Sequence, residues 1–479
     1  SMGFFCRPSL TGSVRLLTSA YGYQLADGQL VSVETVRNLI PSQEVAAITA
    51  ATAGNSVICL DVDPEKLKTL SKGEAPFYEP GLSELMTSSI ESGNLTFSGE
   101  PESAYENADI IFICVGTPTG EDGRCNLSFV MGVADDIANT IGAQKDREVV
   151  VVVKSTVPVG TTHAVAARLS KSSVANFCIA NNPEFLREGC AIDNFLQPDR
   201  IVCGFEDDHA KNTLTELYEP FIGDDRPLLF FDICSSEMVK YASNAMLACK
   251  ISFINEIATL CERNGANIEN VREGMCADNR IGTQFYKSGI GYGGSCFPKD
   301  TLAVMEMGDD LDAPCLVNTA VHELNQRQRR WFADRIVKQF GGSLEGKKVA
   351  IWGLAFKPQT DDVRDAPSID IARTLSSLGA TISAYDPEAS ETFLKEFADV
   401  HIAPDMYSAI DDVDALVICT EWKEFHAPDF DKMKQHMKEP VVFDGRNLYT
   451  MECMQKHDFQ YFSVGRPDVV SQPVQDTRE

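Results

Sequence analysis

The sequence predicts an α/β protein with two doubly wound parallel sheets joined by a long helix and a helical middle region. Three observations predict this class. Short apolar, β-branched runs alternate with amphipathic stretches from Gly54 onward, residues 235–263 contain neither Pro nor Gly, and a second alternation begins at Lys348. Strands separated by helical segments form βαβ units, which build parallel sheets covered on both faces.

The expected elements follow in order along the chain. Strands are expected at 56–62, 110–115, 149–154, 176–180 and 201–204, and later at 348–352, 381–385, 415–419 and 441–443. Residues 235–263 place apolar side chains three to four apart and predict one long helix. An amphipathic segment, 316–340, precedes a hinge at 341–343 (GGS). We therefore expect the chain to divide into 1–44, 45–225, 226–340 and 341–479.

Composition and charge exclude several classes of protein. Apolar residues are 44% and charged residues 23% of the 479, as in ordinary soluble globular proteins. Asp and Glu number 70 against 42 Lys and Arg, and the net charge of −28 would repel a nucleic acid backbone. We therefore expect no nucleic acid partner. A site for a nucleotide or phosphate ester would have to concentrate a few cations in a cleft.

The fifteen cysteines indicate the compartment. Their number is odd, none lies in C-x-x-C spacing, and a chain of this length needs no disulfides for stability. No apolar run reaches the roughly 18 residues that a membrane span needs. We expect a cytoplasmic protein with reduced thiols, no membrane association and no metal site.

Several strands of the first domain end in turns that suit a ligand. Asp61 ends the strand expected at 56–62, where a Rossmann fold holds the adenine ribose of NAD. This signal alone is weak, because strand-end aspartates are also common in solvated turns. The segments 114–119 (CVGTPT) and 153–158 (VKSTVP) also leave strands, at the edge where parallel sheets bind ligands.

The most distinctive cluster is GIGYGGSCFPKD at 289–300. The glycines before Cys296 allow a ligand to approach main-chain N–H groups, and Lys299 and Asp300 can tune thiol and proton chemistry. Most cysteines are inert core residues, but this context favours a reactive Cys296.

Two further positions carry less specific signals. Glu184 lies in a loop after a strand, where an acid near a helix start is usually only a cap. Lys240 and Asn244 are four residues apart and share a face of the expected long helix. A lysine on an apolar helix usually extends to solvent, whereas one that faces a cleft can polarise an oxygen.

These motifs, in this order, resemble the UDP-glucose 6-dehydrogenase family within the wider UDP-glucose/GDP-mannose dehydrogenase family. The resemblance runs from about Gly54 to about Phe459. Its seven motifs are FYEPG (77–81), VGTP (115–118), KSTVP (154–158), NPEFLREG (182–189), GGSCFPKD (293–300), GLAFKP (353–358) and FDGR (443–446). The segments 185–192 (FLREGCAI) and 198–201 (PDRI) look more like the UDP-glucose branch than the GDP-mannose or N-acetylmannosamine branches.

The resemblance implies NAD-dependent oxidation of UDP-glucose to UDP-glucuronate in two hydride transfers, through a thioester on the cysteine. The implied catalytic residues are Cys296 as nucleophile, Lys240 as oxyanion stabiliser, Asp300 as base or water-positioning group, and Glu184, Thr156 and Asn244 as the rest of the water network.

The resemblance also implies where the ligands bind. Residues 45–225 would form an NAD-binding Rossmann-like domain, 226–340 a central helical and dimerisation domain with the catalytic cysteine loop, and 341–479 a UDP-sugar-binding Rossmann-like domain. Substrate-binding residues would be Phe185, Leu186, Arg187, Glu188, Lys287, Ser288, Gly289, Ile290, Gly291, Tyr292, Gly293, Phe356, Lys357 and Arg446, with Arg280 from a neighbouring subunit of a homodimer or larger homo-oligomer. NAD-binding residues would be Asp61, Lys66, Val115, Gly116, Thr117, Pro118, Thr119, Ser155, Thr156, Glu188, Lys299 and Arg364.

The chain departs from the family at its start, so that 1–44 forms an atypical N-terminal segment. Family members have a strand and a G-x-G-Y-x-G turn shortly before the position of Gly54, where this sequence reads IPSQ at 40–43. Another candidate, YGY at 21–23, lacks the three-glycine pattern. Three explanations are open: a replaced first coding segment, a variant that binds the cofactor poorly, or a catalytically impaired nucleotide-sugar-binding relative that assembles with active subunits. The first is favoured because Asp61, Lys66 and every catalytic position are in place.

Overall fold

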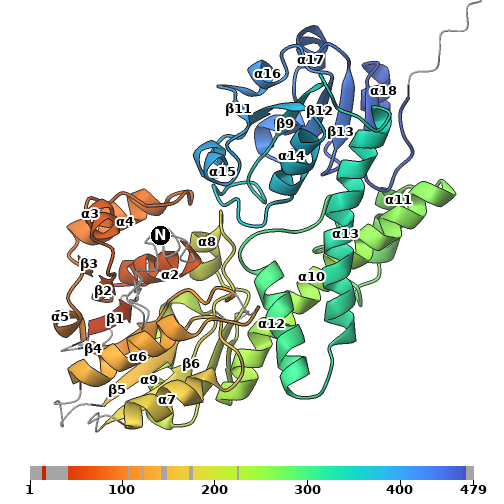
Figure 1. The fold of residues 1–479 in the computed structure, drawn as a ribbon. Helices are drawn as coiled ribbons and strands as arrows, with labels where there is room; N and C mark the ends of the chain where they lie inside the picture. Colours follow the sequence, from red (N-terminus) through yellow and green to blue (C-terminus); the bar gives the residue numbers. More distant parts are fainter. Residues whose placement is uncertain are drawn as a thin grey trace, which may run out of the picture. The chain divides into compact units, whose positions relative to one another are not determined.

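A computed structural model describes residues 13–17, 41–105, 108–120, 123–141, 148–171, 176–223 and 226–470. The chain forms two compact units, Ser1–Ser243 and Asn244–Glu479, and each is described by itself. The boundary falls within one long helix, α10 (Ile233–Asn264) (Figure 1). This helix was expected at 235–263, so the predicted connector is confirmed.

The first unit contains a six-stranded sheet in the order β1-β4-β5-β6-β7-β8, with β6 and β7 antiparallel and all other pairs parallel. A parallel pair, β2-β3, continues beside β1. The strands are β1 (Ser13–Leu17), β2 (Val57–Leu60), β3 (Leu95–Ser98), β4 (Ala108–Ile113), β5 (Val149–Val153), β6 (Phe177–Asn181), β7 (Ile201–Phe205) and β8 (Leu228–Phe231). The five strands predicted from β-branched runs are present, whereas β3 and β8 were not predicted.

Helices cover both faces of this sheet. Ile110 and Phe112 of β4 pack into one apolar cluster, with side chains of α2, α4 and α9, and Ile111 and Ile113 pack into another, with side chains of α6 and α7. This alternation follows from the two-residue period of a strand and explains why β4 and β5 are apolar throughout. The helices of this unit before α10 are α2 (Pro41–Thr52), α3 (Pro64–Leu70), α4 (Leu82–Glu91), α5 (Pro101–Tyr105), α6 (Ser128–Ile141), α7 (Thr161–Ser170), α8 (Ala191–Leu196), α9 (Asp208–Tyr218) and the short η1 (Glu219–Phe221).

The first strand of the sheet lies inside the segment 1–44, which the sequence analysis separates from the α/β domain. β1 pairs in parallel with β4, with Val14 opposite Ile110 and Leu17 opposite Ile113. The next described element is α2, which begins at Pro41. Residues 18–40, which include the YGY candidate at 21–23, lie outside the described part of the chain.

The second unit contains the remainder of α10, a set of helices and a fully parallel sheet in the order β11-β10-β9-β12-β13-β14. Numbered within the sheet, this is the 3-2-1-4-5-6 order of a Rossmann fold, which confirms the predicted fold class. The strands are β9 (Lys348–Trp352), β10 (Thr381–Tyr385), β11 (His401–Ile402), β12 (Ala415–Ile418), β13 (Val441–Asp444) and β14 (Gln460–Ser463). The helices are α11 (Ile268–Cys276), α12 (Phe297–Asp310), α13 (Leu316–Gln339), α14 (Pro367–Ser377), α15 (Ser390–Glu396), α16 (Met406–Ala409), η2 (Lys423–His426), α17 (Phe430–His436) and α18 (Met451–Lys456).

One apolar core joins the middle helices to the second sheet. Ile254 of α10 and Phe332 of α13 are fully buried in the same cluster as Trp352 of β9. Trp352 stacks on Phe425, with ring centroids 5.1 Å apart, and its indole N–H donates to the Met406 carbonyl at 2.9 Å. The middle helices and the second sheet therefore share one apolar core. Among the described helices, none is both long and apolar enough to cross a bilayer.

Candidate active site

The loops that leave β2, β4, β5 and β6 emerge at the carboxyl edge of the first sheet, where parallel sheets bind ligands. Asp61 follows β2 and is buried, and its Oδ2 lies 3.0 Å from Nζ of Lys66. The main-chain N–H of Asp63 donates to Asp61 Oδ1 at 3.0 Å. The structure thus brings together two residues predicted to bind NAD, of which Asp61 was expected to hold the adenine ribose.

The loops after β4 and β5 are tied to each other. The Thr117 hydroxyl donates to the Thr156 carbonyl at 2.8 Å, and the Ser155 hydroxyl donates to the Val115 carbonyl at 2.7 Å. Val115, Gly116, Thr117, Ser155 and Thr156 are buried, whereas Pro118 and Thr119 are exposed. The predicted cofactor loops therefore form one connected edge.

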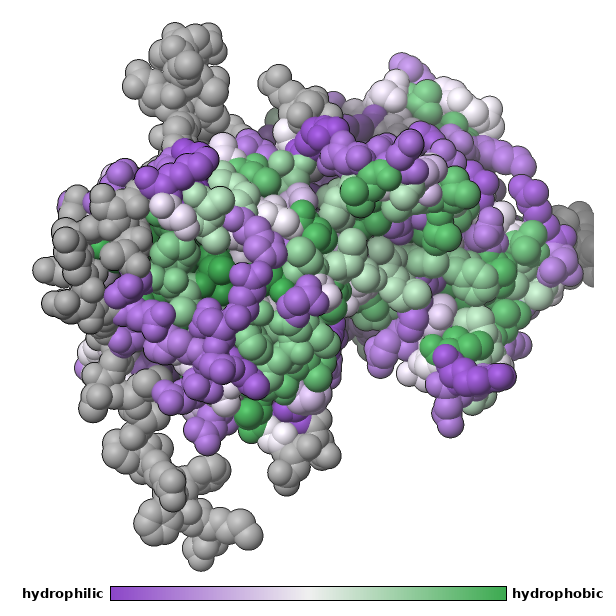
Figure 2. All heavy atoms as spheres, turned by 90° about the horizontal axis from the view of Figure 1, so that it is seen from below, coloured by the Kyte–Doolittle hydropathy of each residue, from purple (hydrophilic) through white to green (hydrophobic). Residues whose placement is uncertain are grey.

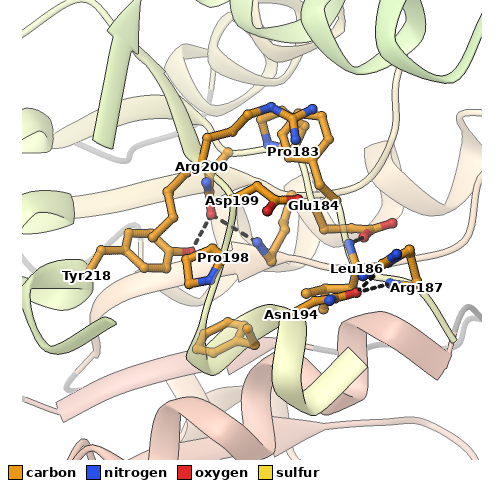
Figure 3. Close-up of a pocket in the computed structure, with 14 residues that line it drawn as sticks. Pro183, Glu184, Leu186, Arg187, Asn194, Pro198, Asp199, Arg200 and Tyr218 are labelled. Atoms are coloured by element: carbon orange, nitrogen blue, oxygen red, sulfur yellow. Dashed lines mark hydrogen bonds between the residues drawn. The ribbon is translucent and has the colours of Figure 1, made fainter. Parts of the chain in front are cut away.

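Glu184 lies on the loop that follows β6 (Figure 3) and forms a buried pair with Lys240 of α10. Nζ of Lys240 donates to the Glu184 main-chain carbonyl at 2.7 Å and lies 3.4 Å from its carboxylate Oε1. The other oxygen, Oε2, accepts from the main-chain N–H of Leu186 at 2.5 Å. A fixed ammonium group beside a fixed carboxylate can stabilise an oxyanion and orient a water.

The Phe185 ring lies between two cations. The Arg200 guanidinium carbon is 3.8 Å from its centroid and Lys240 Nζ is 5.4 Å away. Phe185 and Arg200 line the pocket in Figure 3 together with Pro183, Leu186, Arg187, Asn194, Pro198, Asp199 and Tyr218. Arg187 is exposed and donates to the Asn194 side chain at 3.1 Å, and Glu188 is half-buried. Arg200 was not among the predicted site residues.

Lys154 is a buried cation of this pocket to which the sequence assigned no role. Its Nζ donates to Asn182 Oδ1 at 3.0 Å, and the Tyr218 hydroxyl donates to the same oxygen. Burial lowers the pKa of Lys154, and it raises the pKa of the neighbouring Cys114 thiol to about 12. Cys114 is therefore an inert thiol despite its place at a strand end.

Two buried carboxylates, neither of them predicted as a site residue, hold the ends of the loops that lead from β5 to α7 and from β6 to α8. Glu237 of α10 accepts from the main-chain N–H groups of Gly160 at 2.6 Å and Thr162 at 2.8 Å, where α7 begins. Glu79 accepts from Gly189 N–H at 2.6 Å and Ala191 N–H at 2.7 Å, where α8 begins. An acid at a helix N-terminus satisfies otherwise unpaired N–H groups.

The second unit positions the cysteine. Cys296 is the N-cap residue of α12, and the main-chain N–H of Asp300 donates to its carbonyl at 2.8 Å. Asp300 is 1% exposed; Asn244 Nδ2 donates to its Oδ2 at 2.6 Å, and Lys299 Nζ donates to its Oδ1. Cys296 is half-buried and lies 3.6 Å from the Ser295 hydroxyl, measured from Sγ to Oγ. The predicted thiol, carboxylate and amide are thus brought together at a helix N-terminus, which favours negative charge.

The carboxyl edge of the second sheet carries the predicted UDP-sugar residues. The Arg446 side chain donates to the Cys419 carbonyl at 2.7 Å, the Gly291 carbonyl at 3.2 Å and the Phe356 carbonyl at 3.4 Å. It therefore joins the loops after β9, β12 and β13 to residues 288–293, which we call the substrate loop. Lys357 Nζ lies 5.3 Å from the Phe356 ring centroid. These loops meet at the point between β9 and β12 where the strand order reverses, the usual nucleotide position in this fold.

Three predicted ligand-binding residues, Arg280, Lys287 and Arg364, are not among the residues that the contacts above connect. Arg280 is exposed and forms a salt bridge with Asp278, and Lys287 is also exposed. The Arg364 side chain donates to the Asp362 carboxylate at 2.7, 2.9 and 3.1 Å. The assignments of Arg280 to a neighbouring substrate site and of Lys299 and Arg364 to NAD remain predictions.

Comparisons with known proteins agree with this arrangement. Three family descriptions match along the chain: the NAD binding domain of the UDP-glucose/GDP-mannose dehydrogenase family over 44–222, its central domain over 234–327 and its UDP binding domain over 350–451. The chain is 45% identical to UDP-glucose 6-dehydrogenase of Rhizobium meliloti over 429 residues, covering 88% of this chain and 97% of that protein. It is 42% identical to UDP-glucose 6-dehydrogenase TuaD of Bacillus subtilis, covering 89% and 91%.

Solved structures show the same fold. A UDP-glucose dehydrogenase from Pyrobaculum islandicum superimposes with a TM-score of 0.82 at 36% identity, covering 93% of this chain and 96% of that one. A UDP-D-ManNAc dehydrogenase from Pyrococcus horikoshii has a TM-score of 0.78 at 23% identity and shares the fold. The family matches, the relatives and the geometry agree: the chain belongs to the UDP-glucose/GDP-mannose dehydrogenase family.

Proposed function

We propose that the chain oxidises UDP-glucose to UDP-glucuronate with NAD, through a covalent intermediate on Cys296. The observation that carries the proposal is the pairing of Cys296, at the N-terminus of α12, with the buried Asp300 one turn later. A thiol and a fixed carboxylate on one helix face suit nucleophilic capture of an aldehyde followed by hydrolysis. Four relatives that are 41% to 45% identical to the chain, including the two described above, are all named as UDP-glucose 6-dehydrogenases. Their names support UDP-glucose as the substrate.

The described residues of the first unit fit NAD. Asp61 ends β2 with its carboxylate held by Lys66, so it can accept hydrogen bonds from ribose hydroxyls. The connected loops that contain Val115 to Thr119 and Ser155 to Thr156 would line the nicotinamide side. When bound, NAD accepts a hydride from C6 in each of two steps, so that one UDP-glucose, two NAD⁺ and one water give UDP-glucuronate, two NADH and three protons.

The chain's own residues capture and release the sugar carbon. After C6 has become an aldehyde, Cys296 Sγ forms a bond to it and the carbonyl oxygen becomes the hydroxyl of a thiohemiacetal. Loss of the second hydride and of the hydroxyl proton leaves a thioester. Water then adds to the thioester carbon, the C–S bond breaks, and the carboxylate and the free thiol are released.

The remaining polar groups have complementary tasks. Lys240 stabilises the oxygen of C6 as charge develops on it, because its ammonium group is buried and already oriented by Glu184. Asp300 accepts the proton of the attacking water, with its carboxylate held by Asn244 and Lys299. Glu184 and Thr156 orient that water.

The nucleotide is held by the second unit. Arg446 and Lys357 supply positive charge for the diphosphate, and main-chain groups of the substrate loop supply hydrogen bonds. Phe185, Leu186, Arg187 and Glu188 complete the sugar side. These cations are the few that a chain with a net charge of −28 concentrates at its ligand site.

We also propose that the chain acts as a homodimer or larger homo-oligomer. Met246, Phe253 and Leu260 of α10 are 58%, 43% and 54% exposed, and their spacing of seven residues places them on one face of the helix. Leu316 and Val317 of α13 line a groove beside Phe253. In the view of Figure 2, exposed apolar residues gather between polar ones on the surface. A second copy would cover this stripe and would bring Arg280 to a neighbouring substrate.

The cytoplasm is the proposed compartment. Fourteen cysteines lie in the described part of the chain, and all fourteen are free thiols. Free thiols persist in a reducing compartment. A nucleophilic Cys296 also needs a reducing compartment, because it must remain a free thiol to react.

The test of the function is the stoichiometry of the reaction. The purified chain, given UDP-glucose and a high concentration of NAD, is expected to yield two NADH for each UDP-glucuronate detected by mass spectrometry. Formation of one NADH with a released aldehyde would overturn the covalent mechanism. UDP-glucose binding without any NADH would indicate the impaired relative that the N-terminal sequence leaves open.

A further inference from the structure

Main-chain groups of the substrate loop are held by buried amide side chains from two helices. Gly289 donates its N–H to Asn255 Oδ1 of α10 at 2.8 Å, and its carbonyl accepts from Gln328 Nε2 of α13 at 2.8 Å. Tyr292 donates its N–H to Asn325 Oδ1 at 2.9 Å, and its carbonyl accepts from Asn325 Nδ2 at 3.0 Å. Both ends of the loop are therefore fixed through a donor and an acceptor.

These three amides are buried and have specific partners. Asn255 and Asn325 are 3% exposed and Gln328 is 6% exposed. An amide side chain offers both an acceptor and a donor, so Asn325 can satisfy both main-chain groups of Tyr292 as a neighbouring strand would. A carboxylate in place of this amide offers only acceptors. One of its two oxygens would then lie against the Tyr292 carbonyl oxygen, to which Asn325 Nδ2 now donates.

The same loop contacts the turn that carries Arg446. Ile290 N–H donates to the Gly445 carbonyl at 3.1 Å, and Arg446 donates to the Gly291 carbonyl at 3.2 Å. The packing leaves no room for side chains, because a Cβ at Gly291, where φ is +96°, would lie 2.6 Å from Asn325 Oδ1. Substitution of Asn325 or Gln328 would therefore move the loop relative to the Arg446 side chain that contacts it.

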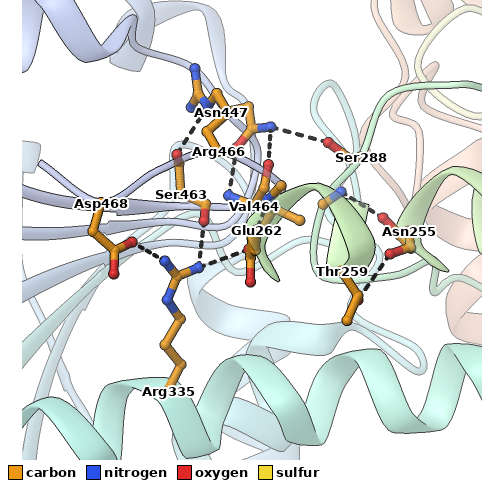
Figure 4. A network of polar contacts seen from close by, with 12 residues as sticks. Asn255, Thr259, Glu262, Ser288, Arg335, Asn447, Ser463, Val464, Arg466 and Asp468 are labelled. Carbon is orange, nitrogen blue, oxygen red and sulfur yellow. Dashed lines mark hydrogen bonds and ion pairs between the residues drawn. The ribbon is translucent and has the colours of Figure 1, made fainter. Parts of the chain in front are cut away.

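A fourth amide continues the network on the other side of the loop (Figure 4). Asn447 Nδ2 donates to the Ser288 hydroxyl at 3.1 Å and to the Val464 carbonyl at 2.8 Å, and its Oδ1 accepts from Val464 N–H at 2.9 Å. Figure 4 also shows Asn255 beside the segment that contains Ser288. The loop is thus held from the helices on one side and from the β13 and β14 ends on the other.

We propose that Asn325 and Gln328 of α13 are positioning residues that hold the substrate loop in its binding shape and so set the affinity for the UDP sugar. The inference rests on the proposed function, which assigns this loop to the UDP sugar. A loop that is ordered before binding loses less conformational entropy when the ligand arrives, and a loosened loop binds more weakly.

Titration calorimetry with UDP-glucose, without NAD, tests the proposal in the full chain. Asn325→Asp and Gln328→Glu keep the side-chain shape and remove one donor each. Both are expected to raise the Kd about tenfold, with the number of sites per chain unchanged. The matched control is Gln326→Glu, the same change on the next residue of α13, whose side chain makes no hydrogen bond to any residue that the structure describes. Its Kd is expected to stay within about twofold.

The number of sites separates positioning from a general loss of structure. Misfolding removes sites and leaves the Kd of the remaining ones unchanged, and that result would overturn the proposal, as would an unchanged Kd in both variants. Two variants are used so that failure of one to fold leaves the other. Absence of UDP-glucose binding by the unaltered chain would instead overturn the proposed function itself.

Discussion

The main-chain N–H of Asp300 donates to the Cys296 carbonyl at 2.8 Å, which fixes the carboxylate one helical turn after the thiol. The first turn of α12 thus carries both groups that the covalent mechanism requires, and Asn244 and Lys299 hold Asp300 in place. Their separation is set by the helix and needs no ligand.

Replacing the thiol should stop acid formation without removing substrate binding. In Cys296→Ser, C6 can still lose the first hydride, but a hydroxyl at this position is a far weaker nucleophile than a thiolate. We expect formation of UDP-glucuronate to fall at least a thousandfold while the Kd for UDP-glucose, measured by calorimetry, stays within about threefold. Turnover at the unaltered rate would exclude a covalent role for Cys296.

Removing either carboxylate should slow release of the thioester more than its formation. Glu184→Gln and Asp300→Asn keep the shape of the side chains but lose the charge that orients or deprotonates the water. We expect a UDP-sugar acyl adduct on Cys296 to accumulate during turnover, and intact-mass spectrometry with peptide mapping detects it. Spectra that show only the unmodified chain in both variants would contradict these roles.

Local sequence patterns were sufficient to predict most strands and the thiol site. β9 and β10 occupy the predicted residues, and all five residues of β5 are valines that are buried on both faces of the sheet. Cys296 and Asp300 were predicted together because they lie within four residues of each other in the sequence. In the structure they are about one helical turn apart, so their proximity is a local property.

Features that depend on distant pairing were not predictable in this way. β3, β8, β11 and β14 were not predicted, and each is defined by its pairing with a neighbouring strand. Glu79 bonds to Gly189, 110 positions later, and Glu237 bonds to Thr162, 75 positions earlier. In the sequence Glu79 is one residue of a turn motif and Glu237 a polar residue on a long helix, and only the fold reveals their partners.

Loss of the Glu237 carboxylate should disturb the Thr156 loop. Glu237→Gln retains one acceptor but presents an NH₂ group to a main-chain donor, at Gly160 or Thr162. We expect faster deuterium exchange of peptides covering 158–163, with exchange at 189–192, beside Glu79, unchanged. Glu206→Gln is the control, because this exposed acid contacts α7 through the His163 side chain and not through main-chain N–H groups. Equal exchange in Glu237→Gln and the unaltered chain would show that the carboxylate does not hold the loop.

A charge within the exposed stripe of α10 should prevent assembly. Phe253→Glu buries a carboxylate in the interface between two copies, and we expect sedimentation to change from a dimer or larger species to a monomer. Leu394→Glu changes a side chain of similar exposure, 40% against 43%, on α15 and should leave the assembly intact. A fully active monomer would contradict both the interface and the contribution of Arg280.

NAD binding should be weak because of the sequence between β1 and α2. A G-x-G-Y-x-G turn offers main-chain N–H groups to the pyrophosphate at a helix N-terminus, but no such turn precedes α2, and Pro41, its first residue, has no N–H. Loss of two or three charge-assisted hydrogen bonds, at roughly 1.5 to 3 kcal/mol each, weakens binding about a hundredfold or more.

Calorimetry should therefore show UDP-glucose binding with little NAD binding. Replacing residues 18–41 by a short G-x-G-Y-x-G turn between Leu17 and Ser42 should strengthen NAD binding and raise the turnover rate at low NAD concentration, with the Kd for UDP-glucose unchanged. Micromolar NAD affinity in the unaltered chain would mean that these residues supply a pyrophosphate site of another kind.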